Sequence, residues 1–195
     1  MEKDWTTQQV ETMPVIALRG LTIFPNVLIH FDVAREISIK ALEEAMTAGS
    51  PVFLVGQKDL AVEKPEAKDL YTVGTVSKVR QILRMPGDNV RVMVEGLCRG
   101  SLDELKRTSP YLEAVVRTIP AEKAGNNSAK TEALIRSTYE MFQQYTELAP
   151  KTAPDLLINV LASENPGYIA DFIAQNIAMR NSDKQAILEE LRPVR

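Results

Sequence analysis

The chain has 195 residues, of which 45% are hydrophobic and 25% are charged, and its formal net charge at pH 7 is −3. These proportions are ordinary for a globular protein, and the length allows one large domain or two small ones. The negative charge argues against a strongly basic nucleic-acid surface, and the single cysteine excludes an internal disulfide framework.

The first segment, residues 1–12, is polar (MEKDWTTQQVET) and is predicted to be a flexible arm in which Trp5 docks loosely or stays in solvent. It lacks the apolar centre of a secretory signal. No apolar run in the sequence approaches the length needed to span a bilayer. The sequence therefore predicts a cytoplasmic protein without membrane partners.

Residues 13–119 have mainly the period of β-strands. The runs that predict strands are MPVIALR, VLIHFDV, PVFLVG, YTVGTVSKVRQILRM, NVRVMVE, LCRGSLDEL and YLEAVVRTI. One helix interrupts them in REISIKALEEAMTAG, where an apolar stripe (Ile37, Ala41, Leu42, Ala45, Met46) precedes a terminal Gly49. Many short strands with one helix indicate a small barrel or a strongly curved sheet.

The run LTIFPNVLIHFDV, residues 21–33, predicts a half-buried strand with one apolar face. The side chains predicted to point inward are Val27, Ile29, Phe31 and Val33. The same alternation of side chains along the strand directs Leu28 outward, beside His30 and Asp32. In NVRVMVE, Val90, Val92 and Val94 are predicted to point inward and Met93 outward. MPGDN, residues 85–89, predicts the tight hairpin that precedes this run.

Residues 120–128 have no period and many turn formers, which predicts a linker that proteases cut first. Residues 129–195 have the period of helices throughout, and their short loops predict an antiparallel helical bundle. In the first helix the inward face is predicted to hold Leu134, Met141, Phe142, Tyr145 and Leu148. A second helix is expected after Pro154, with Leu156, Leu157, Val160 and Leu161 inward.

Two further helix starts are predicted from capping patterns. Asn165 followed by Pro166 indicates a cap and a first helical residue, with Ile169, Ala170, Ile173 and Ile177 on one face. Ser182 with Gln185 indicates a capping box, with Ile187, Leu188 and Leu191 inward.

The residues predict no catalytic site. The only histidine, His30, lies on the outward face of a strand, and Cys98 is interpreted as a small buried hydrophobe. One histidine and one cysteine cannot supply a zinc site, and there is no Gly-rich phosphate loop. We therefore expect a binding or assembly module with no cofactor and no metal in this chain.

The stretch PVIALRGLTIFPNVLIHFDVAREISIKALEEAM resembles the opening of the N-terminal domain of the ATP-dependent protease Lon. The residues in the family positions are Pro14-Val15, Leu18-Arg19, Phe24-Pro25, Arg35, Ser38-Ile39, Ala41-Leu42-Glu43 and Ala45-Met46. VGTVSKVRQILRMPGDNVRVMVEGLCR, ENPGYIADFIA and DKQAILEEL resemble the family as well, in the same order. Ala17, Ala34 and the early Gly87 depart from the family pattern and affect loop geometry at most.

The resemblance implies an α+β fold, with a PUA-like pseudobarrel at 13–119 and a helical bundle at 129–195, truncated before an ATPase module. In the family, ATP, Mg²⁺ and a Ser-Lys dyad belong to later domains, and the protein forms a homo-hexamer. The implied role of this chain is to capture unfolded or damaged protein substrates and to contact neighbouring N-domains.

A receptor for unfolded protein needs accessible apolar surface. The residues expected to form it are Phe24, Pro25, Leu28, Met85, Pro86 and Met93. Met and Pro suit such a surface because Met adapts to varied partners and Pro has little entropy to lose. The competing interpretation is that Phe24 and Pro25 cap the barrel and Leu28 packs under the bundle.

Two alternative functions remain open at the level of sequence. A stand-alone adaptor could recognise a ligand or a degradation signal with the same barrel, and sequence beyond Arg195 would distinguish it. RNA binding could use Lys78, Arg80 and Arg84, which alternate along one predicted strand. Acidic residues outnumber basic ones, 26 to 23, so nucleic acid is the weaker alternative, and a gel shift with mixed RNA would test it.

Overall fold

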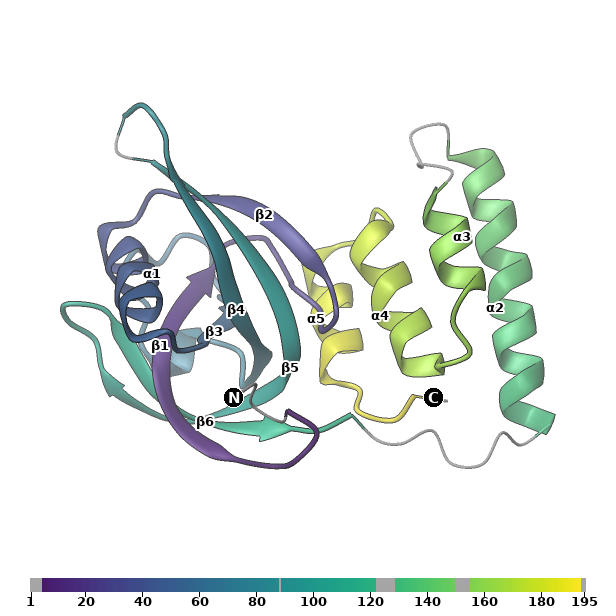
Figure 1. Cartoon of the computed structure of the whole chain (residues 1–195), viewed down its shortest axis with the longest axis horizontal. Helices are drawn as coiled ribbons and strands as arrows, with labels where there is room; N and C mark the ends of the chain where they lie inside the picture. The colour runs from purple at the N-terminus through teal and green to yellow at the C-terminus, as the bar shows by residue number, and fades with distance from the viewer. Residues whose placement is uncertain (1–4, 88, 122–128, 150–154, 194–195) are drawn as a thin grey trace. The chain divides into compact units, whose positions relative to one another are not determined.

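The computed structural model describes residues 5–87, 89–121, 129–149 and 155–193 (Figure 1). The chain divides into two compact units, Met1–Pro120 and Ala121–Arg195. This division falls one residue after the end of the strand-rich part predicted at 119. Residues 122–128, most of the predicted linker, lie outside the described residues.

The first unit is a mixed sheet with one α-helix. Its elements are β1 (Val10–Leu18), β2 (Leu28–Val33), α1 (Glu36–Ala48), β3 (Val52–Gly56), the short 3₁₀ helix η1 (Ala67–Asp69), β4 (Val73–Arg84), β5 (Val90–Arg107) and β6 (Leu112–Ile119). The strand order is β2-β5-β4-β3-β1-β6, and β5 also pairs with β6. Among the described strand pairs, β1 and β3 are parallel and the others are antiparallel. The β5–β6 pairing closes the curved sheet into a ring, while its relation to PUA-type barrels stays a prediction.

Two sequence predictions about the strands were wrong. The predicted arm, residues 1–12, overlaps β1, because the backbone of Val10 and its neighbours pairs with β6 although their side chains are polar or exposed. The two runs NVRVMVE and LCRGSLDEL form one continuous strand, β5. Gly96 lies between them without ending the strand, so the glycine marks a close approach of another segment rather than a turn.

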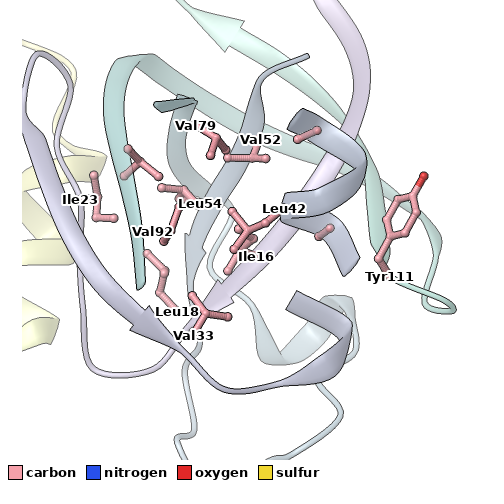
Figure 2. Close-up of a cluster of buried hydrophobic side chains, with 13 residues drawn as sticks. Ile16, Leu18, Ile23, Val33, Leu42, Val52, Leu54, Val79, Val92 and Tyr111 are labelled. Carbon is pink, nitrogen blue, oxygen red and sulfur yellow. The ribbon is translucent and has the colours of Figure 1, made fainter. Parts of the chain in front are cut away.

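Two clusters of buried side chains form the core of this unit. Figure 2 shows the first, in which Leu42 of α1 lies with Ile16 and Leu54 from the sheet. The predicted stripe on α1 is buried at Ala41, Leu42 and Ala45, whereas Met46 is 45% exposed. Gly49 adopts a left-handed conformation with a φ of 62° and ends the helix, as predicted.

Cys98 belongs to the second cluster, together with Phe53, Val76 and Leu112. Burial, and to a smaller extent the charge of Glu11, raises the pKa of its thiol to about 12. The thiol is therefore held in its neutral form, which agrees with its interpretation as a small hydrophobe.

The second unit contains α2 (Ala129–Leu148), α3 (Asp155–Leu161), α4 (Pro166–Asn176) and α5 (Asn181–Glu189). Helices α2, α3 and α4 contact one another, and α5 contacts α4. Phe142, Val160 and Ile169, one from each of the first three helices, form the buried centre. These contacts support a helical unit, and its description as an antiparallel bundle stays a prediction.

The packing face predicted for α2 was wrong in part. Phe142 is buried and Tyr145 partly so, but Leu134, Met141 and Leu148 are 43%, 64% and 84% exposed. In α3 and α5, Val160 and Leu188 are buried as predicted, whereas Leu161 is 55% exposed. Leu191 lies after the end of α5 and is 39% exposed. The predicted start after Pro154 falls at the border of the described residues, and the side chain of Leu157 is not described.

The two predicted caps had different outcomes. Asn165 caps α4 as predicted, because its side-chain Oδ1 accepts hydrogen bonds from the backbone N–H groups of Gly167 at 3.0 Å and Tyr168 at 3.2 Å. The capping box at Ser182 is absent, since the residue before α5 is Arg180 and Ser182 lies inside the helix.

We predict that Asn165→Ala lowers the stability of the second unit by about 1 kcal/mol, because two N–H groups lose their acceptor. Ser182→Ala is the matched control and should change stability by less than about 0.5 kcal/mol. Urea unfolding followed by circular dichroism measures both. Equal effects of the two substitutions would contradict this assignment of the caps.

We also predict that Cys98 does not react with a thiol reagent such as dithionitrobenzoate at mildly alkaline pH while the protein is folded. The raised pKa leaves almost no thiolate, and burial blocks access. Reaction should appear only when denaturant unfolds the first unit. Rapid reaction of the native protein would show that the thiol is accessible.

Candidate functional site

The outer face of β2, β5 and β4 carries Leu28 and Met93, two of the residues that the sequence singled out. The alternation in β2 is as predicted: Leu28, His30 and Asp32 are exposed, while Ile29, Phe31 and Val33 point to the inner side. Strand register then defines three rows across this face: Leu28–Glu95–Lys78, His30–Met93–Gln81 and Asp32–Arg91–Leu83.

The apolar members of these rows lie on a diagonal of the face. Leu28, Met93 and Leu83 each come from a different row and a different strand, and Met85 follows Leu83 at the end of β4. Diagonal neighbours in a sheet lie within reach of long side chains. We call Leu28, Met93, Leu83 and Met85 the outer stripe; Leu28 is 61%, Leu83 47% and Met85 39% exposed, and Met93 is partly buried.

A shallow hollow of about 230 Å³ lies along this stripe. Its lining consists of His30, Gln81, Leu83, Arg91 and Met93. The lining therefore combines two apolar side chains, Leu83 and Met93, with three polar ones.

Ion pairs neutralise the charges on both sides of the stripe. Arg91 donates two hydrogen bonds to Asp32, at 2.7 and 2.9 Å, and Arg80 donates to Glu95 at 2.6 Å. The hydrogen bond from Arg91 holds the pKa of Asp32 below its usual value, and the same bond raises the pKa of Arg91. Such exposed pairs contribute little to stability, but they remove net charge from the border of the stripe.

Four of the six predicted site residues lie at the surface, and two do not. Leu28, Met85 and Pro86 are exposed and Met93 is partly buried, whereas Phe24 is 0% exposed and Pro25 is buried. The prediction that Phe24 and Pro25 belong to an exposed apolar surface was therefore wrong.

Backbone contacts explain why Phe24 and Pro25 are buried. The loop that carries them crosses β5 at Gly96, where a Cβ would collide with the carbonyl oxygen of Phe24. Asn26 N–H donates to the Gly96 carbonyl at 2.9 Å, and the Thr75 hydroxyl donates to the Ile23 carbonyl at 2.5 Å. These contacts fix the loop against the sheet, so its apolar side chains fill the core.

Sequence reasoning missed Leu83 because of an irregularity in β4. Simple alternation from Val79, which points inward, would also direct Gln81 and Leu83 inward. The register shifts between Val79 and Gln81, so Ile82 pairs with buried Val92 and Leu83 turns outward. No feature of the sequence near Arg80 marks this bulge.

The same bulge separates the three cations that alternate in the sequence. Arg84 pairs in register with buried Val90 and its side chain donates to Glu43 of α1 at 2.6 Å. Lys78 lies in the outer row with Glu95, and Arg80 is held by that same carboxylate. The row of Lys78, Arg80 and Arg84 considered for RNA is therefore not formed on one face.

No group of three or more His, Cys, Asp or Glu side chains able to hold a metal ion occurs among the residues that the structure describes. Nor does that part of the chain contain a helix with the length and apolar character needed to cross a membrane.

Comparisons with known proteins agree on one family. A family model described as the ATP-dependent protease La (LON) substrate-binding domain matches residues 12–195. The chain is 37% identical over 186 residues to a Lon protease of Desulforamulus reducens, covering 95% of this chain and 23% of the relative. It is 39% identical over 193 residues to a Lon protease of Clostridioides difficile, covering 97% of this chain and 24% of the relative. The chain thus spans about a quarter of the length of these curated relatives.

Solved structures show the same fold. The N-terminal domain of Lon protease from the Mycobacterium avium complex matches with a TM-score of 0.71 at 16% identity, over 94% of this chain and 92% of that one. The Lon N-terminal domain protein of Xanthomonas campestris matches with a TM-score of 0.64 at 12% identity, over the same shares of the two chains, 94% and 92%. The family match and the relatives together show that this chain belongs to the Lon substrate-binding domain family.

Proposed function

We propose that this chain is the N-terminal substrate-binding domain of an ATP-dependent Lon-type protease, and that it binds unfolded or damaged protein through the outer stripe. The observation that carries the proposal is the diagonal of exposed apolar side chains on the outer face of β2, β5 and β4. Unfolded chains expose many apolar side chains that folded proteins bury, so an accessible apolar stripe fits unfolded chains as partners.

The chemistry of the stripe fits partners of varied sequence. Met93 and Met85 have flexible side chains that adapt to different contacts. The neighbouring charges are already paired within the domain, through Arg91 with Asp32 and Arg80 with Glu95. An approaching apolar segment therefore meets no unpaired carboxylate or guanidinium at these two ion pairs. Because the segment is itself uncharged, it needs no counterion from the domain.

The remaining steps of proteolysis are proposed to take place outside this chain. We assign ATP and Mg²⁺ binding, and peptide hydrolysis by a Ser-Lys dyad, to the three quarters of the relatives' length that this chain does not cover. Neighbouring N-domains in a homo-hexamer would bring several copies of the outer stripe to one substrate. A PUA-like barrel, a helical bundle and a cytoplasmic location complete this proposal.

We predict that Leu28→Ser, Leu83→Ser and Met85→Ser together weaken binding of unfolded protein by about a hundredfold, since roughly 1 kcal/mol is lost with each of the three apolar contacts. The positions are exposed, so each change should cost less than about 0.5 kcal/mol of stability. The probe is reduced, carboxymethylated α-lactalbumin, and the readouts are fluorescence anisotropy and the melting temperature.

The matched control replaces three other exposed apolar residues of the same unit, Val10, Met46 and Leu60, which are 59%, 45% and 53% exposed, by Ser. This variant should bind the probe like the unchanged protein. Equal losses of affinity in both variants would mean that any exposed apolar residue can bind the probe, and not the outer stripe in particular. A large fall in melting temperature would mean that the stripe is part of the core.

A further inference from the structure

Strand β2 is the one strand of the described sheet that has a single neighbour. The order of strands places it at the border, where it pairs only with β5 (Figure 1). Every other described strand hydrogen-bonds to at least two others, because β5–β6 pairing closes the ring. A strand with one neighbour presents a row of backbone N–H and C=O groups that can pair with another chain.

The register identifies which backbone groups point away from β5. Gly96 N–H donates to the Val27 carbonyl at 2.9 Å, and Leu28 lies opposite Glu95. Hydrogen-bonded and non-hydrogen-bonded pairs alternate in an antiparallel ladder, so Ile29 and Phe31 bond to β5. The N–H and C=O groups of Leu28, His30 and Asp32 are then directed to the open edge.

The inner side of β2 is also incompletely covered. Ile29 and Phe31 point to the core side, but both stay partly exposed, whereas their partners on β5, Val94 and Val92, are 0% exposed. The burial of an apolar strand face needs neighbours on both sides. A strand added at the open edge would complete the burial of Ile29 and Phe31.

The edge lacks the devices that usually prevent such pairing. The sequence of β2, LIHFDV, contains neither Pro nor Lys, and the charge of Asp32 is held by Arg91 in two hydrogen bonds. An incoming segment therefore meets no proline, no lysine and no unpaired carboxylate on β2. Leu28 belongs both to this edge and to the outer stripe, so the two surfaces are continuous.

We propose that β2 accepts an extended segment of unfolded polypeptide as an additional strand, which pairs with the backbone of Leu28, His30 and Asp32. The segment is uncharged and apolar on both faces, so that one set of its side chains covers Ile29 and Phe31 and the other lies beside Leu28. The inference rests on the proposed function, because it takes unfolded protein as the partner, and it adds main-chain recognition to the outer stripe.

The first test uses the fluorescein-labelled peptide GSTVIVLTSG and a copy with N-methyl groups on two adjacent central residues. Adjacent N–H groups point to opposite edges of a strand, so the methylated copy cannot pair through either edge, while its side chains are unchanged. With the full chain, we expect the methylated peptide to bind at least about tenfold more weakly, since hydrogen bonds are lost and a methyl group blocks approach.

The second test changes the protein. His30→Pro removes a backbone N–H that points to the open edge, at a position where an edge strand tolerates Pro. His30→Ala is the matched control, because it removes the side chain and keeps the N–H. We expect His30→Pro to bind the unmethylated peptide at least about tenfold more weakly than His30→Ala does, with circular dichroism confirming that both fold. If His30→Pro does not fold, the comparison of the methylated and unmethylated peptides alone decides whether strand addition occurs.

The outcomes separate this inference from the proposed function. Strand addition is overturned if the chain binds both peptides with equal affinity, or if His30→Pro binds the unmethylated peptide as tightly as His30→Ala does. Either result leaves the outer stripe as the receptor. Failure of the chain to bind carboxymethylated α-lactalbumin or either peptide overturns the proposed function and this inference with it. A further outcome is that the chain forms a dimer that His30→Pro dissociates and that the peptide does not displace. That result would assign the edge to a second copy of the chain and would also overturn strand addition.

Discussion

Strand β5 has two edges and three partners, and this constraint organises the first unit. One edge pairs with β4 along most of its length, while the other pairs first with β2 and then with β6. Because β6 continues to β1 and closes the ring, β2 remains outside the ring with one edge unpaired. The open edge of β2 is thus a consequence of how the barrel-like sheet closes, and any sequence that closes it in this way has the same border strand.

The change of partner along β5 occurs near Gly96, and the missing side chain there has a structural role. A Cβ at Gly96 would collide with the Phe24 carbonyl, so only glycine lets the loop before β2 cross the strand so closely. The crossing carries Phe24 into the core and leaves Leu28, four residues later, 61% exposed. A single close approach therefore separates the core from the candidate binding surface.

Sequence reasoning succeeded where the pattern is local and failed where a tertiary partner decides. Alternation placed Leu28 and Met93 correctly, since the strand period depends only on the backbone. It missed Leu83, because a bulge shifts the period and leaves no mark in the sequence. It misplaced Phe24, because burial of a loop depends on what the loop packs against. On α2, Met141 and Phe142 are adjacent and both apolar, and only the position of α3 and α4 selects Phe142 for the core.

An unfolded chain differs from a folded one in two physical properties: its apolar side chains are accessible, and its backbone N–H and C=O groups lack partners. A surface that reads only the first property also attracts the apolar patches of folded proteins. The outer stripe offers apolar contact, and the edge of β2 at Leu28, His30 and Asp32 offers backbone pairing beside it. Because backbone pairing is independent of side-chain identity, combining the two selects for the unfolded state and not for a sequence, which is the selectivity that a receptor for damaged proteins requires.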